Sequence, residues 1–88
     1  MPPALLALLE RVRGTSFTQS ENTEQARAAL QRALEIAEAN QVEYEAGHAL
    51  RALAKLWALR GDPVEAAAAG KAASTIFGRL GVDESVMP

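Results

Sequence analysis

The stretch that decides the fold is GDPVEAAAAGKAAS, residues 61–74. Asp62 is a residue type that caps helices at the N-terminal end, and Pro63 suits the first helical position. Glu65 follows the cap by three residues, as in a capping box. The pattern predicts a helix over 63–80. Its middle is almost entirely alanine, and side chains this small allow neighbouring helices to approach closely.

Three more helices are predicted upstream of this one. In each, apolar residues recur at helical spacing, and residues typical of turns separate the segments. The predicted helices cover 3–13, 23–39 and 42–60, with a polar loop after the first and short turns after the others. In the alternative interpretation, the first helix continues toward Phe17. Short connections make neighbouring helices antiparallel. The predicted fold class is therefore all-α.

The whole chain of 88 residues is short enough to form one domain. We expect a helical domain over 1–81. It consists of an irregular N-terminal helix and loop in 1–21 and repeat-like helices in 22–81. Residues 82–88 are expected to form a flexible tail.

The composition restricts the class of function. The net charge is −2, so the chain has no general basic surface for nucleic acid, and without cysteine it has neither disulfides nor a Cys-based zinc site. The N-terminal apolar run is too short to span a bilayer and lacks the layout of a signal peptide. We expect a cytoplasmic protein that binds neither nucleic acid nor a membrane.

An internal repeat is visible at an offset of forty residues. The predicted caps Asn22 and Asp62 coincide, and so do Gln25 and Glu65, three residues after each cap. The other coincident positions are Ala26, Ala28, Ala29, Ala33 and Ile36 with Ala66, Ala68, Ala69, Ala73 and Ile76. A period of this length is typical of stacked supersecondary units.

The second unit resembles the tetratricopeptide repeat in an extended, forty-residue form. The residues that carry the resemblance are Leu50, Leu53, Ala54 and Trp57, then Gly61–Asp62, then Ala66 and Ala73. The resemblance implies antiparallel helical hairpins stacked as a short array of about four helices. It also implies a protein–protein interaction module, in which the first helix of each unit lines a concave groove that holds a protein or peptide segment.

Carried onto the predicted third helix, the resemblance places His48, Arg51, Lys55 and Leu59 on the ligand side. The first three share one helical face, and such a basic stripe suits an acidic or carboxylate-ended peptide. The alternative interpretation is the solvated face of a mostly buried helix.

The residues that could support catalysis lack partners in the sequence. His48 is the only histidine, so neither a catalytic triad nor a histidine–thiol metal site is indicated. The carboxylates Glu35, Glu38, Glu43 and Glu45 are expected to form a solvated face. We predict no catalytic residues, no metal and no cofactor, and hence a protein that is not an enzyme.

The predicted fourth helix has more small residues than one hairpin needs. We expect Ala66, Ala69, Gly70, Ala73 and Phe77 to mark a second close contact, made by the N-terminal helix or by another chain. A homodimer is one form of that contact. The alternative functions are accordingly a self-assembling or capping module and a fragment of a longer tetratricopeptide regulatory protein.

Overall fold

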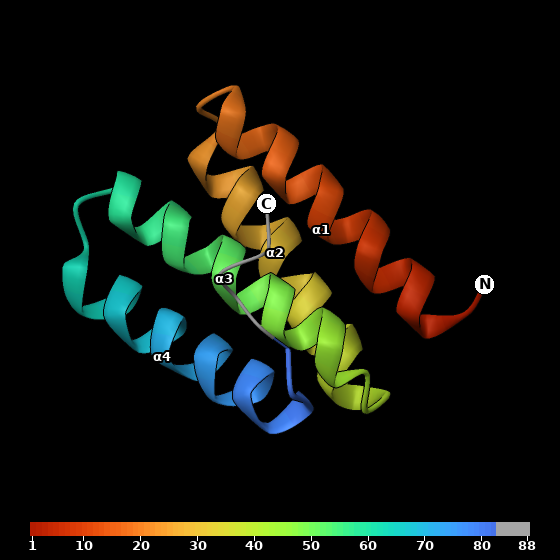
Figure 1. Ribbon diagram of the computed structural model, residues 1–88. Coiled ribbons are helices and arrows are strands. Elements are labelled where there is room, and N and C mark those ends of the chain that lie inside the picture. The colour runs from red at the N-terminus through yellow and green to blue at the C-terminus, as the bar shows by residue number, and fades with distance from the viewer. Residues whose placement is uncertain (83–88) are drawn as a thin grey trace.

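The computed structural model describes residues 1–82, and these form four helices. They are α1 (Pro3–Gln19), α2 (Thr23–Ala39), α3 (Glu43–Leu59) and α4 (Pro63–Leu80). The helices alternate in direction and succeed one another across the molecule, from α1 on one side to α4 on the other (Figure 1). The all-α prediction is confirmed. The predicted tail, apart from Val82, lies outside the described residues.

The four helices end in the same turn, repeated every twenty residues. The residue that reverses the chain has a positive φ in every case: Glu21 (64°), Gln41 (58°), Gly61 (79°) and Gly81 (75°). The N–H of the next residue donates to the carbonyl five positions back, at 2.8–2.9 Å: Asn22 to Phe17, Val42 to Ala37, Asp62 to Trp57 and Val82 to Phe77. This is the hydrogen bond of a Schellman turn. The forty-residue repeat therefore consists of two helices, each closed by one such turn.

The first helix is longer and more regular than the sequence suggested. Helix α1 continues through the predicted loop to Gln19. The hydroxyls of Thr15 and Thr18 are satisfied within the helix, because each donates to a carbonyl one turn back: Thr15 to Arg11, and Thr18 to Gly14, each at 3.0 Å. The predicted loop after residue 13 is therefore wrong, and the alternative in which the helix continues toward Phe17 is closer to the structure.

The helix starts are placed as predicted, but the capping boxes do not form. Asn22 and Asp62 are the N-cap residues of α2 and α4, yet neither side chain makes a capping hydrogen bond. Both have ψ near 75°, outside the extended region typical of capping residues. Each cap follows a Schellman turn directly, and the Asn22 amide donates to Ser20 Oγ instead.

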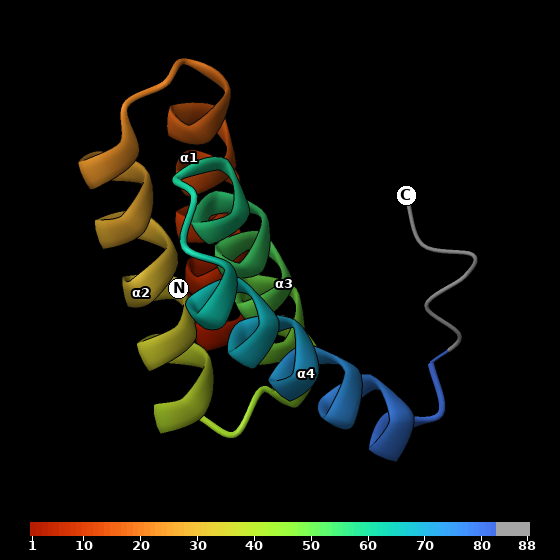
Figure 2. The ribbon, with the colours of Figure 1, turned by 90° about the vertical axis from the view of Figure 1, so that its left-hand side faces the viewer.

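The helices pack so that α3 lies at the centre of the array. It contacts α1, α2 and α4, whereas the extensive contacts of α4 are with α3. In the side view, α2 lies on one side of α1 and α3 (Figure 2). Two buried clusters join α2 to α3. One consists of Ala26, Leu30, Leu53 and Leu56, and the other joins Ala37 and Ala46 to Ala7 of α1.

Glycines set the closest approach of the helices within each hairpin. A Cβ added at Gly14 of α1 would lie 2.6 Å from Leu30 Cγ of α2, and one at Gly47 of α3 would lie 2.9 Å from the Phe77 ring of α4. These distances are below ordinary contact, so a larger residue does not fit at either position. No helix within residues 1–82 is long and apolar enough to cross a membrane.

Candidate functional site: a basic groove between α1 and α3

The groove that best fits a binding site lies between the first helices of the two hairpins. It has a volume of about 240 Å³ and is open to solvent. Its lining residues are Arg11, Thr15 and Thr18 from α1, and His48, Arg51, Ala52 and Lys55 from α3. The structure thus brings together three of the four residues that were predicted to bind a partner, together with α1 residues that were not predicted.

Leu59 lies beyond this groove, in an adjoining hollow. Leu59 is 74% exposed and lines a second concavity of about 460 Å³, together with α1 residues and the turn after α1. Thr18 lines both hollows, so they meet at one point. The predicted stripe on α3 therefore divides between the two hollows. His48, Arg51 and Lys55 line the first, and the exposed Leu59 lines the second, near the C-terminal end of α3.

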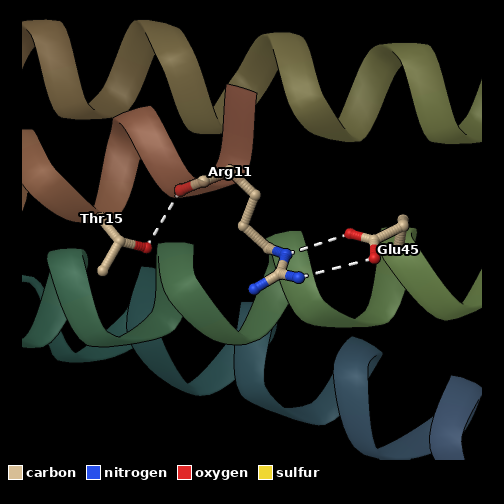
Figure 3. A network of polar contacts seen from close by, with 3 residues as sticks. All are labelled: Arg11, Thr15 and Glu45. Carbon is tan, nitrogen blue, oxygen red and sulfur yellow. Dashed lines mark hydrogen bonds and ion pairs between the residues drawn. The ribbon is translucent and has the colours of Figure 1, made fainter. Parts of the chain in front are cut away.

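Arg11 crosses from α1 to α3 and pairs with Glu45 (Figure 3). Arg11 Nε lies 3.0 Å from Glu45 Oε2, and Arg11 Nη2 lies 3.5 Å from Oε1. Glu45 is only 9% exposed, so the expectation that it belongs to a solvated acidic face is wrong. A carboxylate this buried needs a paired charge, and Arg11 supplies it. The pair also fixes the relative position of the two groove helices.

His48 lies among aromatic rings at one end of the groove. Its ring centroid is 4.5 Å from that of Tyr44 and 5.2 Å from that of Phe77, both edge-on. Burial, and then the positive charges of Arg11 and Arg51, lower the pKa of His48 below its ordinary value, while Glu45 acts in the opposite direction. The lowered pKa favours the neutral form of the His48 ring. Because Arg11 is paired with Glu45, the net positive charge of the groove comes from Arg51 and Lys55.

Arg51 and Lys55 carry that charge on α3. The Arg51 guanidinium lies 5.3 Å from the centre of the Phe77 ring of α4, within cation–π range. Lys55 is exposed. One of these cations is thus held in place by packing, and the other extends into solvent.

The α1 side of the groove was missed because the repeat was predicted to begin at residue 22, so the first helix was not aligned with the third, and because Thr15 and Thr18 fell in the predicted loop. Once α1 is seen to run from Pro3 to Gln19, Arg11 stands forty residues before Arg51, in the same position of the repeat. The same offset relates Thr15 to Lys55. Aligning the first helix with the third would have found both residues.

The polar groups of the groove are suited to recognition of a ligand. Residues 1–82 include no group of three or more acidic or histidine side chains placed to hold a metal ion. The Thr15 and Thr18 hydroxyls already donate to backbone carbonyls, which leaves their oxygens able to accept from a ligand. The groove can thus offer cations to an anionic group and hydroxyl oxygens to N–H groups.

The residues predicted to make a second contact on α4 pack mainly against α3. Ala73 and Phe77 are buried, Ala69 packs on the cluster that holds Leu53 and Leu56, and a Cβ at Gly70 would lie 3.9 Å from Ala54 Cβ. The remaining one, Ala66, is half-buried. The N-terminal helix is not their partner, because α1 packs on α2 and α3.

Comparison with known proteins adds no relative. No protein-family model, no curated protein and no solved structure matches this chain.

Proposed function

We propose that this protein is an interaction module that binds a segment of another protein in the groove between α1 and α3. The observation that carries the proposal is that Arg51 and Lys55 line one open concavity, beside the Arg11–Glu45 pair. The groove selects an acidic or carboxylate-ended segment by charge complementarity. The role is recognition rather than catalysis.

Two features of the site support recognition. The Arg11–Glu45 pair joins the two helices that form the groove, so the groove is present in the unliganded chain, and preorganisation lowers the cost of binding. Its cations are also concentrated, although the chain as a whole is acidic with a net charge of −2. The resemblance to tetratricopeptide repeats agrees with this use of the first helix of each hairpin.

The test is selection of peptides from a random display library on the immobilised protein, followed by fluorescence anisotropy with the selected peptides. We expect acidic peptides whose affinity falls as salt concentration rises. Lys55→Glu should weaken their binding by roughly three- to tenfold, as for an exposed charge pair that becomes repulsive.

Lys71→Glu is the matched control. Lys71 is an exposed lysine on α4, outside the groove, and its reversal changes the net charge by the same amount. If both variants lost affinity equally, the change in net charge would explain the loss, and no role of Lys55 in the groove would be needed. A library that yields no binder, or only binders indifferent to Lys55→Glu, would contradict the proposal.

A further inference from the structure

Helix α1 has an apolar face that none of the described residues, 1–82, covers. Leu5, Leu9 and Val12 share one side of α1 by helical spacing, and Leu6 lies beside them. Each of the four is 40–54% exposed. In a chain of this size such a row of exposed aliphatic side chains is more than scattered surface hydrophobicity.

The corresponding face of α3 is buried. Forty residues after Leu6 and Leu9 stand Ala46 and Ala49, which are 4% and 0% exposed. Ala46 lies in a cluster with Ala37 of α2. Helix α2, together with Ala7 of α1, therefore covers on α3 a position that is open on α1.

The repeat also indicates which surface would cover α1. Helix α4 stands forty residues after α2, and α1 and α4 lie at opposite sides of the molecule (Figure 1). Leu34 of α2 packs against the clusters that contain Ala46 and Leu53, and its counterpart on α4 is Ser74. Ser74 is exposed, so the side of α4 that matches the covering side of α2 is open.

We propose that α1 of one molecule docks on α4 of a second copy of this chain, head to tail. The contact continues the packing series α1–α2, α2–α3 and α3–α4 from one molecule into the next. The side chains are complementary in size: α2 sets Leu34 against the alanine face of α3, and α4 sets Ser74 against the leucine face of α1. This contact is separate from the groove, so it does not depend on the proposed function.

The size of the face predicts the kind of assembly. A helix of seventeen residues is about 26 Å long, and its one open face is small beside the roughly 800 Å² per partner of a stable interface. A head-to-tail contact is also heterologous and leaves the outer ends open. We therefore expect weak association whose average mass rises with concentration, without stopping at a dimer.

The absence of native cysteine allows an unambiguous test by disulfide crosslinking. Two single variants, Leu9→Cys and Ser74→Cys, are oxidised separately and as a mixture, and the products are separated on non-reducing gels. Crosslinked dimers should form in the mixture and be scarce in either variant alone. Strong self-linking of Leu9→Cys would overturn the proposal in favour of α1 pairing with its own copy.

Sedimentation of variants without cysteine provides the second measurement. Leu9→Glu should abolish the rise in mass with concentration, whereas Leu59→Glu, an equal change at an exposed leucine outside the α1 face, should leave it intact. Circular dichroism confirms that both variants fold. A chain that remains monomeric up to millimolar concentration and gives no crosslink in the mixture would overturn the proposal.

Discussion

The hairpins α1–α2 and α3–α4 have the same succession of helices and turns, but they place their large buried side chains at different positions of the repeat. In the first hairpin, glycine meets a large side chain at Gly14 and Leu30. Forty residues later the same positions hold two small residues, Ala54 and Gly70.

The second pair of positions shows the reverse. Ala7 and Ala37 are two small residues in one buried cluster of the first hairpin, whereas their counterparts Gly47 and Phe77 place glycine against an aromatic ring. Each hairpin thus has one pair of facing positions in which a large side chain lies opposite glycine, and another pair in which both residues are small. What the repeat preserves is room for one large side chain, which explains why the residue identities agree so poorly at these positions.

The largest effect should follow removal of the aromatic ring from the second hairpin. Phe77 is fully buried and touches Gly47, Tyr44 and His48. Phe77→Ala should lower the free energy of unfolding by about 3–5 kcal/mol, measured by denaturant titration. In a domain of this size that is a large share of the total stability.

A second substitution tests whether the effect comes from the contact between Gly47 and the Phe77 ring. Gly47→Ala alone should destabilise, because its Cβ would press on the Phe77 ring at 2.9–3.0 Å. Combined with Phe77→Ala it reproduces the Ala7–Ala37 pair of the first hairpin, and it should recover part of the loss. If Gly47→Ala were equally harmful with and without the ring, this contact would not be the cause.

The next effect concerns the glycine of the first hairpin. A Cβ at Gly14 would lie 2.6 and 2.7 Å from two Leu30 side-chain atoms and 3.2 Å from the Leu30 nitrogen. Leu30 is fully buried, so it cannot turn away freely. Gly14→Ala should cost about 1–3 kcal/mol by overpacking, despite the better helix propensity of alanine. In thermal unfolding, the penalty should shrink when Leu30→Ala is already present; full additivity would contradict the clash.

The same contrast between the hairpins explains how far the sequence could predict this fold. The second hairpin contains strong local signals: Pro63 at a helix start, and Gly61 and Gly81 at the positive-φ turn positions. The first hairpin has Glu21 and Gln41 at those positions instead. Non-glycine residues seldom adopt this conformation, so the twenty-residue period of the turns is hidden from local pattern reading.

The candidate site was predictable only on the α3 side, for a related reason. Helical spacing on one segment places His48, Arg51 and Lys55 on a common face. Glu45 could not be recognised as a buried partner, because its environment depends on Arg11, thirty-four residues away on another helix. Pairing between helices is set by tertiary packing, which spacing within one helix does not encode.

The smallest effect has the opposite sign and comes from Gly70, in the alanine-rich middle of α4. Gly70 is the counterpart of Leu30, forty residues later in the repeat. A Cβ at Gly70 would lie 3.9 Å from Ala54 Cβ, which is an ordinary contact. Alanine in mid-helix is favoured over glycine, so Gly70→Ala should raise the free energy of unfolding by about 0.5–1 kcal/mol. Denaturant titration beside Gly14→Ala gives the sharpest comparison, since one substitution in two hairpins then yields opposite signs. Destabilisation by Gly70→Ala would mean that α3 and α4 approach more closely than Ala54 and Gly70 indicate, and the two hairpins would then differ in their backbone as well as in the placement of their bulk.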